Sequence, residues 1–333
     1  MIRSTMQRAP LSINQLLERA GKLYPDSEIV SRLPDKSLVR HRFADLYRRA
    51  RGLAAALLAA GLKKGDRVAT LCWNHYAHLE CYFGIPAAGG VMHTLNLLLA
   101  PEEIGWIAAH AQDRFLIVDD ILLPLYEQFR GRHAFEKVIV VPFSGANVAP
   151  SFLNYESFIE RETKTFSYVP HDEDDPIAMC YTSGTTGRPK GVVYSHRSTI
   201  IHTMMANQPD NWGLSARDSV LPATPMFHAN CWGMPYACVM MGIKLIFPGP
   251  HLHPEDLLDL LMAEKPTYAL GVPTISTIAG HRPRTARSMN AVPSGNASRW
   301  TSTTSARPAR TTSVNRFNTA IALSESFCGR RPG

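Results

Sequence analysis

The segment from Tyr181 to Gly191, YTSGTTGRPKG, carries residue types that can bind phosphate. Its glycines allow tight turns that bring backbone N–H groups close to an anion. Its hydroxyls add donors and can ligate Mg²⁺, and Lys190 supplies a compact positive charge for a triphosphate or a leaving pyrophosphate. The P-loop of kinases and GTPases requires Ser or Thr directly after the lysine, whereas Gly191 follows it here. A polar surface loop is the alternative, but the length and order of this signature segment (residues 181–191) favour a phosphate-binding loop.

Two shorter segments farther along the chain also hold candidate residues. The histidine segment, Pro225–Trp232, has the sequence PMFHANCW, and the GVPT segment is Gly271–Thr274. His228 and Trp232 lie four positions apart, so a helix that starts here would place them on one side. A large, flat, apolar side chain such as Trp232 could seal a tunnel and swing aside. Taken alone, these residues favour a simpler interpretation, with Trp232 in the core and His228 as a satisfied buried histidine.

Two histidine pairs and two methionine pairs are weaker candidates. They are His75 and His78, three positions apart in an expected helix, His251 and His253, Met204–Met205, and Met240–Met241. Either histidine pair could bind a metal, but neither has a third ligand nearby in sequence, so surface or loop histidines are favoured. Both methionine pairs are predicted to fill the core.

Apolar runs alternating with helix-like stretches predict an α/β fold with largely parallel sheets up to about Gly280. Helices are expected over Phe43–Ala60, which Gly61 would stop, and over Pro254–Glu264, which begins with proline. The second helix should turn Leu257, Leu258 and Leu261 to one face. Buried strands are expected at Arg67–Trp73, Phe115–Val118, Lys137–Val141, Ile177–Tyr181, Ser219–Leu221, Lys244–Phe247 and Thr267–Leu270.

Length and composition indicate a globular protein. The 333 residues suffice for two domains, and 45% of them are hydrophobic and 19% charged. No apolar stretch approaches the roughly 18 residues of a membrane span, and the start lacks the apolar run of a secretory signal. The six cysteines are scattered without metal-ligand spacing. This favours a reduced, cytoplasmic protein over a disulfide framework.

The formal net charge of +7 is concentrated at the end of the chain. Residues 281–333 contain nine arginines, no lysine, one glutamate and no aspartate, which gives +8 and leaves −1 for the first 280 residues. This Ser/Thr/Arg-rich stretch has almost no apolar periodicity, so it cannot bury enough surface to offset the entropy of ordering. A disordered basic tail and translation out of frame are the two interpretations, and the composition favours the second. A tail that binds nucleic acid would show salt-sensitive binding, but no nucleic-acid partner is expected.

The signature segment resembles the phosphate-binding signature of the adenylate-forming enzymes, which include acyl-CoA synthetases, firefly luciferases and the adenylation domains of peptide synthetases. The histidine segment is similar to the family's next motif, and the GVPT segment to the part that lines its acyl pocket. The resemblance covers roughly residues 10–278. In the family, a carboxylate attacks the α-phosphorus of ATP to give an acyl-adenylate and pyrophosphate, and the thiol of coenzyme A then expels AMP. The resemblance implies a fatty acid–CoA ligase that uses ATP, Mg²⁺ and coenzyme A.

The resemblance also implies roles for single residues. Lys190 and His228 would be catalytic, and Thr182 would provide the hydroxyl nearest the metal ion. Trp232 looks like the aromatic gate of the long-chain subgroup, so the implied substrate is a medium- to long-chain fatty acid. The implied phosphate ligands are Thr182, Ser183, Gly184, Thr185, Thr186, Gly187 and Lys190. The implied substrate-binding residues are His228, Ala229, Trp232, Gly271, Val272, Pro273 and Thr274.

Several parts of the family pattern have no counterpart after the GVPT segment. These are the Tyr-Gly-x-Thr-Glu segment, whose glutamate completes the Mg²⁺ site, the aspartate that binds the ribose, and the lysine of the small C-terminal domain. We therefore expect residues 1–280 to form an incomplete N-terminal AMP-binding domain without the β-barrel subdomain or the small C-terminal domain, followed by the tail at 281–333. A weakly active or inactive ligase and a non-catalytic, acyl-binding remnant are the alternatives. The family also implies a homodimer, and a peripheral membrane contact is a further expectation.

Overall fold

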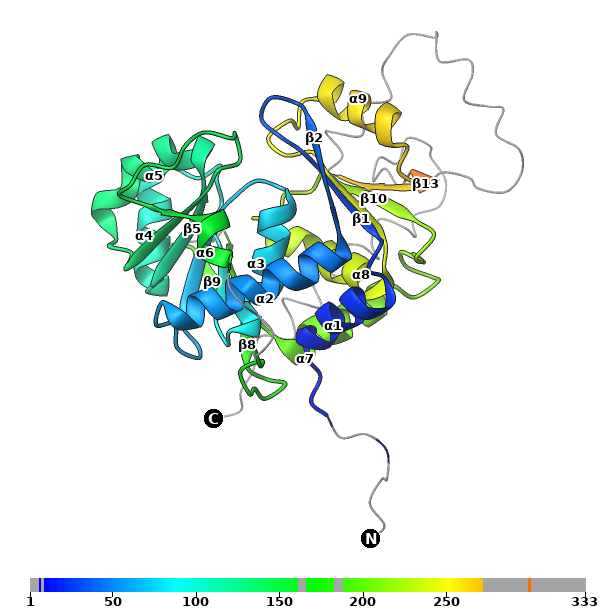
Figure 1. Cartoon of the computed structure of the whole chain (residues 1–333), viewed down its shortest axis with the longest axis horizontal. Coiled ribbons are helices and arrows are strands. Elements are labelled where there is room, and N and C mark those ends of the chain that lie inside the picture. The colour runs from blue at the N-terminus through cyan, green and yellow to red at the C-terminus, as the bar shows by residue number, and fades with distance from the viewer. Residues whose placement is uncertain (1–5, 7–8, 161–165, 183–187, 272–298, 301–333) are drawn as a thin grey trace.

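The computed structural model describes residues 6, 9–160, 166–182, 188–271 and 299–300, which fold around two β-sheets (Figure 1). In spatial order, the first sheet consists of β7 (Leu153–Asn154), β6 (Lys137–Val141), β5 (Phe115–Asp119), β3 (Arg67–Leu71), β4 (Val91–Thr94), β8 (Pro176–Thr182) and β9 (Lys190–Ser195). The second consists of β13 (Arg299–Trp300), β12 (Tyr268–Leu270), β10 (Ser219–Pro222), β11 (Lys244–Phe247), β1 (Glu28–Arg32) and β2 (Leu38–Arg42). Neighbouring strands run parallel, except that β2 and β9 pair antiparallel with β1 and β8.

Helices separate and flank the two sheets. They are α1 (Ile13–Leu23), α2 (Phe43–Ala59), α3 (Tyr76–Ala87), α4 (Pro101–Ala111), α5 (Leu123–Phe129), α6 (Tyr155–Ile159), α7 (His196–Ala206), α8 (Met234–Met241) and α9 (Pro254–Glu264), with 3₁₀ turns η1 (Asp120–Leu122), η2 (Arg130–Arg132) and η3 (Ala229–Gly233). Helices α4 and α5 cover the outer face of the first sheet, and α9 covers that of the second. Helices α1, α2, α3 and α8 share the main core between the sheets.

Helix α3 lies at the centre of this arrangement. It contacts β1 of the second sheet and β3, β4 and β8 of the first. All its residues from Ala77 to Ala87 are buried, because its sequence is apolar on nearly every side. A Cβ at Gly84 would lie 2.8 Å from the carbonyl oxygen of Ala50, so glycine is what allows α2 to approach this closely.

The predicted fold class is confirmed, and several elements have the predicted bounds. The apolar runs at Lys137–Val141 and Lys244–Phe247 form β6 and β11. The stretch that begins with proline forms α9 at Pro254–Glu264. Helix α2 ends where expected, with Gly61 at a φ of 93°, a conformation that glycine adopts readily. Local sequence patterns therefore position these elements.

Other expectations were wrong or incomplete. Strands β1, β2, β4, β7 and β9 were not predicted. The residues of the antiparallel edge strands β2 and β9 are mostly exposed or half-buried, whereas β1 and β4 are buried but have only two consecutive apolar residues each. On α9 the buried leucines are Leu257 and Leu260, whereas Leu258 is half-buried. Met204 and Met205 are 48% and 62% exposed, so this pair does not fill the core. The second methionine pair does pack against the main core.

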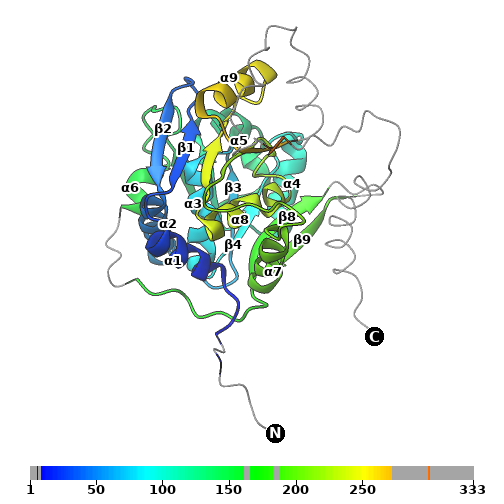
Figure 2. The same cartoon turned by 90° about the vertical axis from the view of Figure 1, so that its right-hand side faces the viewer.

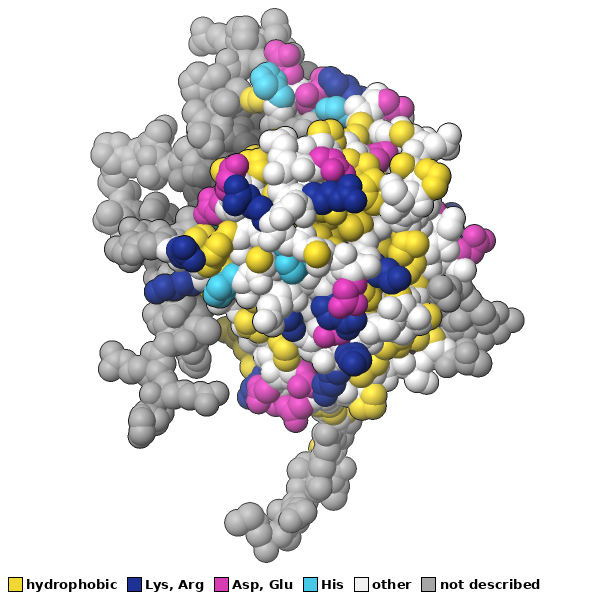
Figure 3. All heavy atoms as spheres, turned by 90° about the vertical axis from the view of Figure 1, so that its left-hand side faces the viewer, with side chains coloured by type: hydrophobic (Ala, Val, Ile, Leu, Met, Phe, Trp, Pro, Cys, Tyr) yellow, Lys and Arg dark blue, Asp and Glu magenta, His cyan; other side chains and the backbone are white. Residues whose placement is uncertain are grey.

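The face formed by the outer layer of the first sheet carries interspersed basic and acidic side chains (Figure 3). Ion pairs of that layer, such as Arg130–Glu127 at 3.2 Å, are exposed and contribute about 0–1 kcal/mol each. Within the described residues, no helix is long and apolar enough to cross a bilayer. The five described cysteines are free and buried, and Cys328 lies outside the described residues. Of the predicted tail, only Arg299–Trp300 is described, as a strand beside β12.

Candidate functional site

The described ends of the signature segment lie on the β8–β9 hairpin, at the edge of the first sheet, and α7 packs beside this hairpin (Figure 2). Strand β8 ends at Thr182, strand β9 begins at Lys190, and these two residues are paired in the antiparallel register. Both are exposed. The hydroxyl and the ammonium group are therefore available to a ligand at one end of the hairpin. Ser183, Gly184, Thr185, Thr186 and Gly187 lie outside the described residues.

The histidine segment does not start a right-handed helix. Ala229, Asn230, Cys231 and Trp232 have φ values of 43° to 53°, so they form a left-handed turn, and Gly233 continues it at 78°. For L-residues this conformation costs roughly 1–2 kcal/mol per residue. The expected helical relation of His228 to Trp232 is therefore wrong, because the reversed hand changes the directions of their side chains.

His228, directly before this turn, and Trp232, within it, differ in burial. His228 is exposed, so the interpretation as a satisfied buried histidine is also wrong, and its imidazole is accessible to a ligand. Trp232 is half-buried and packs against the main core. This position is compatible with both interpretations of the tryptophan, as a packing residue and as one wall of a substrate channel.

Hydrogen bonds join the turn to the strand that carries the signature segment. The Cys180 thiol on β8 donates to Asn230 Oδ1 over 3.2 Å, and Cys180 Sγ lies 3.2 Å from Thr94 Oγ1 on β4. Within the histidine segment, the Cys231 thiol donates to the Thr224 carbonyl oxygen at 3.1 Å. The left-handed backbone is thus stabilised by partners outside the turn, as strained conformations at functional sites require.

The start of the GVPT segment, Gly271, follows a strand that meets the same region. The carbonyl oxygen of Leu270, directly before Gly271, accepts the N–H groups of Ala223 and Thr224 at 2.7 and 3.1 Å. Strands β8, β10 and β12 thus bring all three segments together at their carboxyl ends, where ligands bind in open α/β sheets. Of the predicted residues in this segment, Gly271 is described and half-buried, whereas Val272, Pro273 and Thr274 lie outside the described residues.

Two residues that the sequence did not single out connect the sheets at this point. Asn74, directly beyond β3, is 2% exposed, and its side-chain amide donates to the carbonyl oxygens of Pro222 and Thr224 at 3.0 and 2.9 Å. Its Oδ1 accepts the N–H of Met226 at 2.7 Å. The hydroxyl of Tyr82 donates to the Met226 carbonyl at 2.6 Å. An asparagine at the carboxyl end of a buried parallel strand was the available signal for this role.

A buried polar cluster lies below the site. Ligand atoms of Cys72, His75 and Asp119 are within 4.8 Å of one another, and all three residues are buried. However, His75 Nδ1 accepts the N–H of Ala77, so we assign the ring proton to Nε2, which donates to Asp119 Oδ1 at 2.8 Å. The second carboxylate oxygen accepts the N–H of Trp73. These internal hydrogen bonds satisfy the imidazole and the carboxylate without an ion.

The prediction of surface or loop positions was wrong for the first histidine pair. His75 and His78 are fully buried. His78 Nδ1 donates to the Trp73 carbonyl at 3.0 Å, and its Nε2 accepts from the Thr70 hydroxyl at 3.1 Å. In the other pair, His251 Nε2 donates to the carbonyl of Leu33.

Stability is expected to decrease as the pH falls from about 6.5 towards 3. Burial lowers the pKa of His78 to about 3, and burial together with the neighbouring His171 lowers the pKa of His196 to about 3. In the unfolded chain these histidines take up protons near their ordinary pKa of about 6.5, whereas in the folded chain they do not. Each histidine should therefore lower the free energy of unfolding by about 1–2 kcal/mol at pH 5 relative to pH 7. Urea denaturation at pH 7 and pH 5 measures the difference.

Replacing either histidine by glutamine should reduce this pH dependence, because glutamine does not titrate. The exposed His253 provides the matched control, and His253→Gln should leave the dependence unchanged. An equal change in the free energy of unfolding with pH in wild type, His78→Gln and His196→Gln would show that these histidines do not cause the acid sensitivity.

Two cavities lie away from the three segments. One of about 320 Å³ is lined by Lys64, His171, Asp175 and His196 among others, and one of about 300 Å³ is lined by residues of α1 and by Tyr168. Neither lining includes a described residue of the three segments. We place the candidate site where the segments converge, because the phosphate-binding residue types and the exposed imidazole lie there.

Comparisons with known proteins identify the family. A family model described as AMP-binding enzyme matches residues 17–320. The chain is 43% identical over 291 residues to a long-chain-fatty-acid–CoA ligase of Thermus thermophilus, which covers 85% of this chain and 53% of that protein. It is 40% identical over 274 residues to a medium-chain-fatty-acid–CoA ligase of Ectopseudomonas oleovorans, covering 81% and 50%. The chain thus spans about half the length of the curated relatives it matches.

A solved structure shows the same fold. The inhibitor-bound N-terminal domain of FACL13 from Mycobacterium tuberculosis has a TM-score of 0.69 and 26% identity, and the match covers 82% of this chain and 65% of that one. The family match extends over most of the described residues and includes all three converging segments. The chain therefore belongs to the AMP-binding, adenylate-forming enzymes, within the family of acyl-CoA ligases.

Proposed function

We propose that this chain is the part of a fatty acid–CoA ligase that binds the phosphates of ATP and the acyl group. The observation that supports this most strongly is the convergence of the three segments at the carboxyl ends of β8, β10 and β12. The relatives named as long-chain and medium-chain fatty acid ligases support the substrate class. In the complete reaction, a fatty acid, ATP and coenzyme A give acyl-CoA, AMP and pyrophosphate.

The proposed roles follow from the chemistry of the side chains. Lys190 would neutralise the phosphate oxygens through charge-assisted hydrogen bonds, and the hydroxyls and amides of residues 182–187 would surround the phosphates. The Thr182 hydroxyl is an oxygen ligand of the kind that Mg²⁺ prefers, so it fits an ion held otherwise by phosphate and water. When bound, that ion would neutralise developing charge on the phosphates.

The histidine and GVPT segments would hold the acyl group. His228 is exposed at the start of the left-handed turn, from which it could donate a hydrogen bond to the carboxylate or to the adenylate. Ala229 and the half-buried Trp232 would line the entrance to the acyl channel, together with Gly271, Val272, Pro273 and Thr274. An apolar channel of this kind fits a medium- to long-chain fatty acid.

Lys190→Met is expected to weaken the binding of Mg·ATP by about tenfold, which corresponds to about 1.4 kcal/mol. Isothermal titration calorimetry of the whole chain gives the affinity. Lys137→Met is a matched control, because Lys137 is also an exposed lysine at the first position of a strand. Equal affinities of both variants and the wild type would refute the phosphate-binding role.

A second assay separates an active ligase from a non-catalytic remnant. The pure chain is incubated with ATP, Mg²⁺, coenzyme A and decanoate or palmitate, and thioester formation is followed. Because the chain spans half of its relatives' length, we expect nucleotide binding without appreciable turnover. Rapid thioester formation would exclude the remnant, and failure to bind nucleotide would exclude the phosphate site itself.

Cellular location and assembly are further proposals. We propose a cytoplasmic protein, which the free, buried state of the five described cysteines supports. We also propose a homodimer with peripheral contact to membranes that supply the fatty acid. Light scattering during size-exclusion chromatography tests the dimer, and sedimentation with phospholipid vesicles tests the membrane contact.

A further inference from the structure

One face of α4 contacts both flanks of the signature segment. Trp106 and His110 lie one helical turn apart on α4, so their side chains share a face. Trp106 contacts Arg188, which lies near the end of the signature segment, and His110 contacts Tyr181 at its beginning. Residues seven positions apart along the segment are therefore bound to adjacent side chains of a single helix.

The first contact is a cation–π interaction. The Arg188 guanidinium carbon lies 5.2 Å from the centroid of the Trp106 ring. On its own helix, Trp106 stacks with His110 at a centroid distance of 4.8 Å and an interplanar angle of 25°. The stack restricts the orientation of the indole that Arg188 contacts.

The second contact is a hydrogen bond of 2.6 Å between Tyr181 OH and His110 Nδ1. The ring of Tyr181 also packs 5.2 Å from that of His93, centroid to centroid. His93 is fully buried on β4, and its Nδ1 is bound to the Asp113 carboxylate at 2.8 Å. Tyr181 is thus held from the surface by α4 and from the interior by the sheet.

Helix α4 is a firm support for these contacts. Pro101 occupies its first turn, and Gln112 ends it in a left-handed conformation with its N–H bonded to the carbonyl oxygen of Ala108. On an adjacent face, Ile104 and Ile107 belong to the core cluster on the outer face of the first sheet, and Trp106 packs against the same cluster. A movement of α4 would disturb that cluster.

We propose that Trp106 and His110 are positioning residues for nucleotide binding: they fix the separation and direction of the two flanks of the signature segment, and so set where Thr182 and Lys190 are presented to the phosphates. This rests on the proposed function. Their contribution is to reduce the conformational freedom that Thr182 and Lys190 would otherwise lose on binding.

The test is a double-mutant cycle between Trp106 and Arg188. Trp106→Leu and Arg188→Met should each weaken Mg·ATP binding by about two- to fivefold, the range of a cation–π pair. The double variant should bind Mg·ATP no less tightly than the single variant with the lower affinity, because both substitutions remove the same contact. Trp106→Phe keeps an aromatic face and should restore most of the affinity. Arg217→Met, at an exposed arginine elsewhere, should bind as the wild type does.

Thermal unfolding separates positioning from stability. Arg188 is exposed, so Arg188→Met should leave the melting temperature unchanged while it weakens binding. Additive effects of the two substitutions, or affinities that follow the melting temperature alone, would overturn the proposal.

Hydrogen exchange provides a readout that does not depend on nucleotide. In the free protein, the amides of β9 should exchange faster in Trp106→Leu and in Arg188→Met than in the wild type. If the wild-type chain binds no Mg·ATP, the proposed function fails, and the exchange rates still decide whether α4 orders the segment. Unchanged exchange in both variants would overturn the positioning role even if the wild type binds nucleotide.

Discussion

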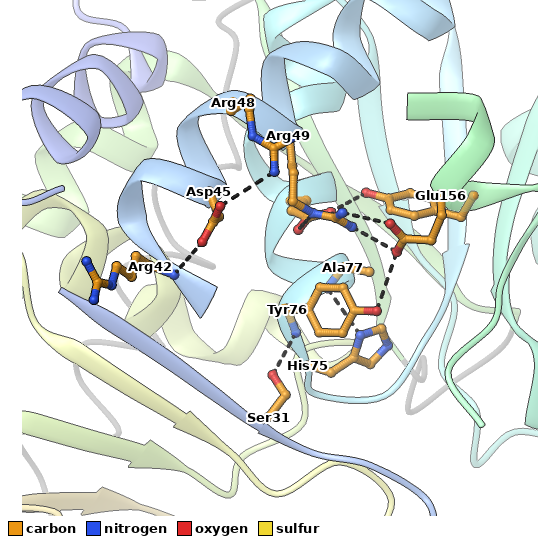
Figure 4. Close-up of polar contacts among 11 residues, drawn as sticks. Ser31, Arg42, Asp45, Arg48, Arg49, His75, Tyr76, Ala77 and Glu156 are labelled. Carbon is orange, nitrogen blue, oxygen red and sulfur yellow. Dashed lines mark hydrogen bonds and ion pairs between the residues drawn. The ribbon is translucent and has the colours of Figure 1, made fainter. Parts of the chain in front are cut away.

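Replacing Arg49 by methionine should lower the free energy of unfolding by about 3–5 kcal/mol, because it leaves buried carboxylate unpaired. The Arg49 guanidinium binds Glu156 at 2.7 Å (Figure 4) and Glu80 at 2.6 Å. The side chains of Arg49 and Glu80 are only 10% and 2% exposed. The hydroxyl of Tyr155 also donates to Glu80. This network joins α2, α3 and α6.

The stability lost in Arg49→Met should depend on pH. Burial raises the pKa of Glu80, and Arg49 opposes that increase. Without the guanidinium, the pKa of Glu80 should rise further, so protonation relieves part of the penalty at low pH. The stability lost in Arg49→Met should therefore be larger at pH 8 than at pH 5, as measured by urea denaturation.

The neighbouring Arg48 provides the matched control on the same helix. Its side chain is 66% exposed and pairs with Asp45 at 3.5 Å, so Arg48→Met should cost less than about 1 kcal/mol. In the Arg49→Met background, Glu80→Gln should recover part of the loss, because it removes the unpaired charge. Similar losses in Arg48→Met and Arg49→Met would show that the network contributes no more than a surface ion pair.

Asn74→Ala should cost about 3 kcal/mol, because three buried backbone groups lose their partner at once. These are the carbonyls of Pro222 and Thr224 and the N–H of Met226. They lie just before the left-handed turn, so the substitution should also release the turn. We expect faster hydrogen exchange at Met226 and a changed fluorescence of Trp232, in addition to the lower denaturation midpoint.

The control for this substitution is Asn96→Ala. Asn96 also lies just beyond a strand, but its side chain accepts only the N–H of Leu98, at a partly exposed position. Asn96→Ala should lower the free energy of unfolding by about 1 kcal/mol or less. A cost of this size for Asn74→Ala would mean that water replaces the amide, and that the connection between the sheets does not depend on Asn74.

The fold could be predicted from sequence wherever the determining interactions are local. Apolar runs identified strands such as β6 and β11, and a first-turn proline and a terminal glycine marked the ends of α9 and α2. The edge strands β2 and β9 escaped prediction because an edge needs no apolar run, and the buried strands β1 and β4 because their apolar runs are only two residues long, so pairing with neighbours defines all four. The same holds for Met204 and Met205, whose exposure depends on what packs against α7.

The candidate site also has one part that the sequence could predict and one that it could not. Its three segments were recognisable because phosphate binding requires particular residue types in a particular order. Their convergence was not visible, since Cys180 meets Asn230 and Asn74 meets Met226 only after 50 and 152 residues of intervening sequence have folded. The burial of His75 and His78 depends in the same way on the packing of α3 between two sheets.

The sequence by itself determined the class of fold, the family and the residue types at the phosphate-binding segment, because periodicity, turn chemistry and motif order are properties of neighbouring residues. Only the tertiary structure decided the hand of the turn after His228, the support of the signature segment by α4, and the ion pairs of Arg49. A backbone of four consecutive residues at positive φ is unfavourable in isolation. It persists because partners outside the turn stabilise it, among them Cys180 on the distant strand β8, and no local pattern encodes that contact.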